Sequence, residues 1–135
     1  MPPPTSSGTA RTIHAFFVAS TSIIAIGAFV ARRSLGPTTT GAGPLDFTAV
    51  LVGLSTLTMV VLFRSRLPDR GGAPLEEWWR ANVGRAVLVW ALLEFPVVIG
   101  AIALFATGHV PVFAILAGLA FAGLATMSPG RLAGG

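Results

Sequence analysis

The chain has 135 residues, a length typical of a single domain. Charged residues make up 10% of it, hydrophobic residues make up 53%, and the mean hydropathy is +0.80. A small soluble domain must cover a large surface with polar groups, and typical globular chains contain about 25% charged residues. The composition therefore excludes an ordinary soluble domain and predicts an integral membrane protein.

All nine basic residues are arginine, and the chain contains no cysteine. Without cysteine it can form no disulfide, thiolate metal site or cysteine nucleophile. The sequence pI of about 11.7 would suit nucleic-acid binding. The arginines, however, stand at the ends of apolar segments, where membrane topology places them, so we expect no nucleic-acid partner.

The first apolar segment covers residues 12–31 and carries no Asp, Glu, Lys or Arg. As a helix it would extend about 30 Å, the thickness of a bilayer core. A signal peptide is the alternative, but Phe29, two positions before Ala31, does not suit a small-x-small cleavage site. We therefore predict a retained transmembrane helix. The residues before it, 1–11, are rich in Pro, Ser, Thr and Gly and are expected to form a disordered tail.

Residues 47–63 form the second predicted span, and Asp46 can cap its start by accepting from free backbone N–H groups. A polar loop follows over residues 64–74. The segment 75–85 then combines acidic residues in a first helical turn with two adjacent tryptophans, which are typical of the membrane interface. We predict a short amphipathic helix on the membrane surface there. The expected interfacial residues are Trp78, Trp79, Arg64, Arg66, Arg80 and Arg85.

Residues 86–107 form the third predicted span, which contains Glu94 and a proline. Gly108 can close this helix with a left-handed cap. The fourth span, residues 110–127, follows so closely that the two must form an antiparallel hairpin, and residues 128–135 are expected to be a flexible tail. The predicted fold is an all-α four-helix transmembrane bundle with the short interfacial helix before its third span.

Arginine counts predict the orientation of these spans. One side of the membrane would receive both termini and the loop between spans two and three, with seven arginines, and the other side only Arg32 and Arg33. Positive residues are retained on the cytoplasmic side. Both termini are therefore predicted to be cytoplasmic, in a multi-pass protein of the bacterial inner (plasma) membrane.

Small residues recur every four positions along the fourth span. Such a stripe allows helix backbones to approach closely in lipid. It can pack against span three or another helix of the same bundle, which is the interpretation we favour, or form a surface for self-association or a partner. The stripe consists of Ala114, Gly118, Ala122 and Thr126.

Glu94 is the one carboxylate inside a predicted span, and an intramembrane carboxylate is costly enough to suggest a function. It lies about 12 Å from the arginine-rich side, a depth shared by hydroxyl groups of spans one and two. Either a protonated Glu94 bonds across helices, a contact worth under about 2 kcal/mol, or it carries a proton or cation. The candidate layer comprises Glu94 with Ser20, Thr21 and Ser22 of span one and Ser55 and Thr56 of span two.

The two histidines do not extend this polar layer. His14 and His109 would lie at opposite membrane faces, so they could not share a metal ion. No Ser-His-Asp set is available, because the one acid within a span is Glu94. We therefore expect no enzyme activity, no metal site and no cofactor.

Residues 46–107 resemble the hairpin of ATP synthase subunit c, the proteolipid of the rotor ring. That family joins two helices by a cytoplasmic loop with an Arg-Gln-Pro signature and has a carboxylate in its second helix. This chain has Arg66-Leu67-Pro68-Asp69 in the loop and Glu94 within ALLEFPVVIG. The resemblance implies that Glu94 carries protons, although spans one and four have no counterpart in that subunit.

The whole chain is also similar to small uncharacterised four-helix membrane proteins of bacteria, which implies a location and a fold but no activity. Three functions are consistent with the sequence. The first is a non-enzymatic accessory or self-associating component of the inner membrane, surrounded by membrane lipids and acting as a homo-oligomer or within a larger complex. The second is proton or cation translocation through Glu94, and the third is binding of a lipid or small molecule in the bundle.

Overall fold

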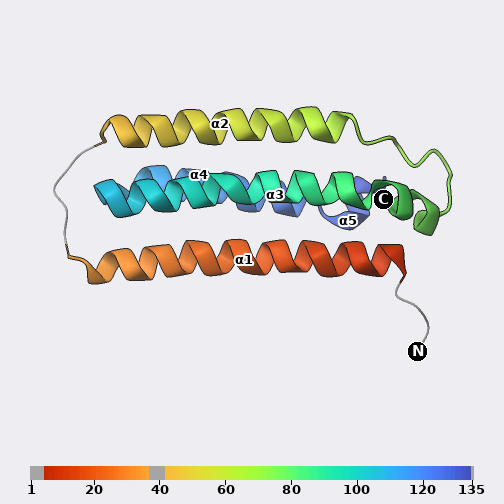
Figure 1. The fold of residues 1–135 in the computed structure, drawn as a ribbon, viewed down its shortest axis with the longest axis horizontal. Coiled ribbons are helices and arrows are strands. Elements are labelled where there is room, and N and C mark those ends of the chain that lie inside the picture. Colours follow the sequence, from red (N-terminus) through yellow and green to blue (C-terminus); the bar gives the residue numbers. More distant parts are fainter. Residues whose placement is uncertain (1–4, 37–41, 135) are drawn as a thin grey trace.

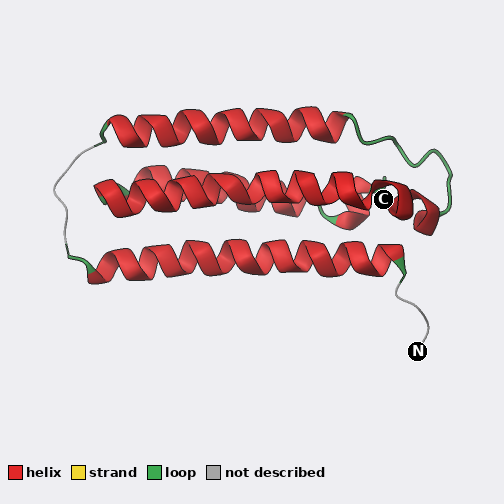
Figure 2. Ribbon diagram, in the orientation of Figure 1, coloured by secondary structure: helices red, strands yellow, loops and turns green. Residues whose placement is uncertain are grey.

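The computed structural model describes residues 5–36 and 42–134, and within these ranges it contains five helices and no strand (Figures 1 and 2). The helices are α1 (Ser6–Ser34), α2 (Pro44–Ser65), α3 (Leu75–Thr107), α4 (Val110–Thr126) and α5 (Pro129–Leu132). The first three are long and apolar enough to cross a membrane, whereas α4 is apolar but has 17 residues. The predicted helical class is confirmed, and three helices meet the length that a membrane span requires.

The helix α1 begins earlier than the sequence indicated. Thr5 provides the N-cap, since its hydroxyl accepts a hydrogen bond from the Gly8 backbone N–H at 3.2 Å. Ser7 is then anchored to α3, because its backbone N–H and its hydroxyl both donate to the Glu76 carboxylate. The prediction of a disordered tail over residues 1–11 is therefore wrong for residues 5–11, and residues 1–4 lie outside the described part of the chain.

The helix α3 is continuous from the expected interfacial segment through the expected third span. Its 33 residues extend roughly 50 Å, well beyond the ~30 Å of a bilayer core. The separate surface helix predicted for residues 75–85 is thus the first part of α3. Gly108 ends the helix with a left-handed φ of 74°, and its N–H donates to the Leu104 carbonyl at 2.8 Å, which confirms the predicted cap.

The packing is centred on α3. This helix lies between α1 and α2, and α4 lies behind it in the view of Figure 1. Each of these three helices makes its most extensive contacts with α3. The predicted all-α class is therefore confirmed, whereas the predicted four-helix bundle is not: the contacts describe a central helix with three neighbours.

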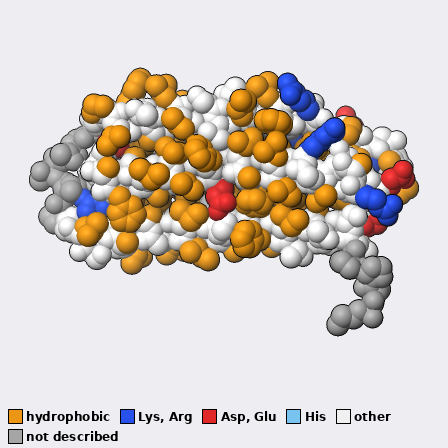
Figure 3. Space-filling model, viewed as in Figure 1, with side chains coloured by type: hydrophobic (Ala, Val, Ile, Leu, Met, Phe, Trp, Pro, Cys, Tyr) orange, Lys and Arg blue, Asp and Glu red, His pale blue; other side chains and the backbone are white. Residues whose placement is uncertain are grey.

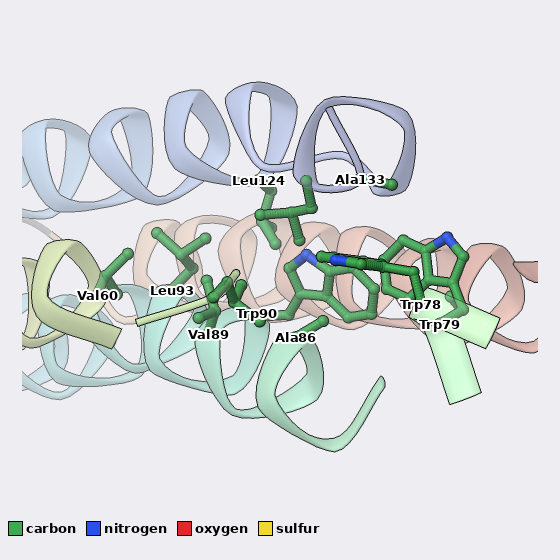
Figure 4. Packing of buried hydrophobic residues seen from close by; sticks show 12 residues of the cluster. Val60, Trp78, Trp79, Ala86, Val89, Trp90, Leu93, Leu124 and Ala133 are labelled. Atoms are coloured by element: carbon green, nitrogen blue, oxygen red, sulfur yellow. The ribbon is translucent and has the colours of Figure 1, made fainter. Parts of the chain in front are cut away.

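The three tryptophans form the centre of a buried cluster at one end of the molecule (Figure 4). Trp78 and Trp79 are 5% and 1% exposed, and their ring centroids are 4.8 Å apart. Trp79 also lies 6.3 Å from Trp90, and the Trp78 indole N–H donates to the Pro68 carbonyl at 3.0 Å. The prediction of Trp78 and Trp79 as an interfacial belt is corrected, because the chain itself covers both rings.

Part of that cover comes from the C-terminal segment. The helix α5 folds against the cluster, and Leu132 and Ala133 are each only 2% exposed. Tryptophan rings offer a large apolar surface whose burial stabilises the segment that covers them. The flexible tail predicted over residues 128–135 is therefore wrong for residues 128–134, and residue 135 lies outside the described part.

The outer surface is apolar along most of its length. Figure 3 shows hydrophobic side chains across the middle of the visible face, with basic side chains towards its two ends. Large residues such as Phe16, Ile23 and Ile26 are 67%, 72% and 65% exposed. A contiguous apolar surface of this kind is unfavourable in water and suits a hydrocarbon environment. The helices are thus compatible with membrane insertion in both length and surface.

Candidate functional site

A carboxyl–hydroxyl pair joins α3 to α1 within their apolar lengths. Glu94 Oε1 lies 2.5 Å from Ser20 Oγ, and Glu94 is half-buried. Ser20 Oγ is also 3.2 Å from the Phe17 carbonyl oxygen. The Ser20 hydroxyl can donate its one proton to either Glu94 Oε1 or the Phe17 carbonyl oxygen. The pair therefore links α1 to α3 through a polar contact between their apolar lengths.

The second carboxyl oxygen of Glu94 is differently placed. Oε2 makes no hydrogen bond to any residue of the described ranges 5–36 and 42–134. Because the residue is only half-buried, a group from outside the chain can approach it. In a hydrocarbon solvent, a carboxyl with one oxygen left without a hydrogen bond would be an incomplete polar site.

The other members of the expected polar layer do not reach Glu94. The Ser22 hydroxyl donates to Val18 O at 2.7 Å, and the Thr56 hydroxyl donates to Val52 O at 2.8 Å, so each is bonded within its own helix. Ser55 is exposed on α2. Because α3 lies between α1 and α2 (Figure 1), the hydroxyl groups of α2 are separated from those of α1 even where both are at the same depth along the helices. The predicted single layer is corrected to one contact, Ser20 with Glu94.

Thr21 lies in the packed interior, away from Glu94 and from the other expected members of the polar layer. It is completely buried, and its hydroxyl has no hydrogen-bond partner among the described residues. A buried hydroxyl without a partner costs roughly 1–3 kcal/mol. Thr21 therefore belongs to the packed side of α1 and not to the polar pair at Ser20.

Ser55 and Thr56 line a groove between α2 and α3 instead. The groove has a volume of about 370 Å³, and its other walls are apolar. It opens on the outer surface between the two helices and includes Phe95, the residue after Glu94. The described structure thus offers an external apolar groove, whereas the sequence predicted a site within the bundle.

Asp46 forms a second polar cluster, at the end of the helices away from the tryptophan cluster. Asp46 is 2% exposed; its Oδ2 accepts from the Gly43 N–H at 2.9 Å and its Oδ1 accepts from the Thr107 hydroxyl at 3.0 Å. His109 Nδ1 lies 3.9 Å from the same Oδ1. The cluster ties the start of α2 to the α3–α4 turn. Sequence reasoning identified Asp46 as a cap but missed its partners, although the predicted hairpin already placed them at the same membrane face.

The two histidines lie at opposite ends of α4, and the sequence had placed them at opposite membrane faces. His14 Nε2 is 3.0 Å from the Leu124 carbonyl near the end of α4, whereas His109 is the N-cap residue of α4. The Trp90 indole N–H donates to the neighbouring Met127 carbonyl at 2.8 Å. These contacts satisfy carbonyls that the end of a helix leaves free. The described residues contain no group of three or more His, Cys, Asp or Glu that could hold a metal ion.

The small-residue stripe of α4 faces away from the other helices. All four of its residues are exposed, and a Cβ built on Gly118 would meet no other atom within 4 Å. The inward side of α4 is formed by larger residues such as Phe113, Leu116 and Leu124. The favoured interpretation, packing of Ala114, Gly118, Ala122 and Thr126 within the chain's own bundle, is therefore wrong. The remaining interpretation is a contact outside the chain.

Four of the expected interfacial residues are found near the cluster of tryptophans. Arg66 lies over the Phe63 ring, with its guanidinium carbon 5.9 Å from the centroid, and Arg85 Nη1 donates to Asn82 Oδ1 at 3.5 Å. Arg66, Arg80 and Arg85 are exposed, and Arg64 is half-buried. These arginines keep the surface positions expected of groups at a membrane boundary.

The chain matches no protein-family model, no curated protein and no solved structure. The resemblance to ATP synthase subunit c therefore stays a prediction. Two features of the chain itself bear on function: three helices are long and apolar enough to cross a membrane, and Glu94, within the apolar length of α3, has one carboxyl oxygen without a hydrogen bond to the described residues.

Proposed function

We propose that the protein is a non-enzymatic membrane component that associates laterally with copies of itself or with another membrane protein through the Glu94 face of α3. We define this face by Leu88, Ala91, Glu94, Phe95 and Ile102, which are exposed except for the half-buried Glu94. The contact with α4 is made by other residues of α3, such as Leu93 and Gly100. The free oxygen of Glu94 is the observation that carries the proposal.

The hydrocarbon interior of a membrane explains why a free carboxyl oxygen would favour association. Lipid chains cannot donate a hydrogen bond to a carboxyl oxygen, whereas a polar group on a facing helix can. Interhelical hydrogen bonds in membranes contribute about 0.6–2 kcal/mol each. A bond of this kind would add to the packing of the apolar neighbours and set the register of the two helices.

The experiment compares Glu94→Leu and Glu94→Gln in reconstituted vesicles. Energy transfer between donor- and acceptor-labelled copies reports self-association. We expect Glu94→Leu to weaken association about tenfold, since it removes the bond, and Glu94→Gln to retain most of it. Glu77→Gln is the charge control, because Glu77 is exposed in the first turn of α3.

Gly118→Leu is the control for the competing surface, the exposed stripe of α4. Unchanged association in Gly118→Leu together with weakened association in Glu94→Leu supports the Glu94 face. The opposite pattern would assign the contact to α4. Association of Glu94→Leu equal to that of the unmodified chain would contradict the proposal for self-association.

A second candidate is proton or cation movement through Glu94, for which the short contact with the Ser20 hydroxyl is the favourable observation. The described residues offer no further carboxylate or basic side chain along the apolar middle of the helices. Glu94→Gln separates the two functions, because it keeps hydrogen bonding and removes the titratable proton. Loss of proton flux with retained association would favour the second candidate.

A further inference from the structure

A small, partly open cavity lies at the arginine-rich end, between segments far apart in the sequence. It has a volume of about 150 Å³ and is lined by Ser7 and Arg11 of α1, Arg70 of the α2–α3 loop, Leu75 and Trp79 of α3, and Ala133 after α5. The burial of Trp79 and Ala133 makes this wall part of the packed structure. The cavity is therefore built by the fold.

Two guanidinium groups without acidic partners line this cavity. Neither Arg11 nor Arg70 forms an ion pair or hydrogen bond through its side chain with a residue of the described ranges. The turn that carries Arg70 is closed by the Ala73 N–H, which donates to the Arg70 carbonyl at 2.9 Å. Guanidinium groups are suited to phosphate oxygens, which they bind through paired N–H groups.

One acid lies close to the cavity and has to be considered. Glu76 follows Leu75 and is bonded by the backbone N–H and hydroxyl of Ser7. These bonds, with a smaller contribution from Arg80, lower the pKa of Glu76, so that it is ionised at neutral pH. Its charge is already engaged by Ser7, and neither Glu76 nor the exposed Asp69, which precedes Arg70, forms an ion pair with the two lining arginines.

We propose that this cavity binds the phosphate group of an anionic phospholipid. Its volume suits a phosphate group, and Val18, two turns beyond Arg11 on the same face of α1, is an apolar residue that is 36% exposed. Acyl chains of the same lipid would lie along that face while the phosphate meets the arginines. The site is independent of the association proposed for Glu94.

The experiment is native mass spectrometry of the full chain in detergent, titrated with phosphatidylglycerol or phosphatidylcholine. We expect tighter binding of phosphatidylglycerol. The Arg11→Gln/Arg70→Gln variant should lose about tenfold or more in that affinity, given about 1 kcal/mol for each basic group near an anionic lipid. Arg64→Gln/Arg66→Gln is the matched control, because it removes the same charge near the same end of the molecule from residues that do not line the cavity.

Two further arms complete the test. Arg11→Lys/Arg70→Lys keeps the charge and should retain more affinity than the glutamine variant, which also shows that the fold survives substitution at both positions. Inorganic phosphate is titrated alone and in competition, and displacement of phosphatidylglycerol by it supports the phosphate contact. Binding of inorganic phosphate without any preference for phosphatidylglycerol would overturn the lipid assignment. Equal losses in the two glutamine variants, or no lipid preference, would overturn the site.

Discussion

At the scale of single residues, polar contacts decide where the N-terminal segment lies. Ser7 holds Glu76 through two hydrogen bonds, and this contact joins the first turn of α1 to the first turn of α3. Proline, serine, threonine and glycine near a chain end are typical of disorder, yet the Thr5 cap and the Glu76 contact order residues 5–11 as helix. Composition does not contain this information, because the partner is 69 positions away.

The same contact predicts a pH dependence. The Ser7 hydroxyl is the main cause of the lowered pKa of Glu76, whose ordinary value is 4.5. A carboxyl with a lower pKa in the folded state contributes stability above its unfolded pKa and loses that contribution as the pH falls through the folded value. We expect Glu76→Gln to lower the unfolding temperature slightly at pH 7, and this difference to shrink as the pH falls below 4.5 and to disappear below the lowered pKa of Glu76 in the folded state.

Thermal unfolding in detergent at a series of pH values measures the effect. Glu77→Gln serves as the control, since Glu77 is an exposed neighbour in the same turn. A difference between Glu76→Gln and the unmodified chain that persists unchanged at low pH would assign the effect to packing and contradict the ionic explanation.

At the scale of helices, neighbouring helices approach each other closely at glycines that do not belong to the small-residue stripe of α4. A Cβ on Gly123 would collide with the Leu93 side chain, and a Cβ on Gly53 would collide with Leu116. Leu93 and Leu116 are each 1% exposed, so neither can move easily. These glycines allow α4 to pack against α3 and α2, and the spacing of small residues along one helix did not identify them.

Two matched substitutions in α4 follow from this packing. We expect Gly123→Leu to destabilise the chain by about 1–3 kcal/mol, because added atoms overpack a filled contact. Gly118→Leu should leave stability near that of the unmodified chain, since the space around Gly118 is open. Thermal unfolding in detergent compares the two, and equal losses would contradict the packing explanation, because leucine has a higher helix propensity than glycine.

At the scale of the whole molecule, the start of α1 and the helix α5 lie at the same end of the structure (Figure 1). This end also carries Arg11, the arginines of the α2–α3 loop and those at the start of α3, whereas Arg32 and Arg33 lie at the opposite end of α1. We propose that the arginine-rich end faces the cytoplasm of the bacterial inner membrane, as the distribution of positive charge favours.

A reporter fusion checks this orientation. A fluorescent protein that matures only in the cytoplasm, fused after residue 135, should be bright, and a periplasmic phosphatase at the same position should be inactive. Substitution of Arg32 and Arg33 by Gln removes the opposing pair and should leave the result unchanged. An active phosphatase fusion in the unmodified chain would reverse the orientation.

The sequence by itself determined the helical class, the apolar helices that suit a membrane and the left-handed cap at Gly108. These follow from local composition and from the rise per residue of a helix, which need no knowledge of neighbours. Only the tertiary structure decided that Ser20 meets Glu94, that Ser55 faces a groove, that Trp78 and Trp79 are covered, and that the α4 stripe points outward. The physical reason is that residue counting sets position along a helix axis, whereas rotation about that axis is set by contacts between segments far apart in the chain.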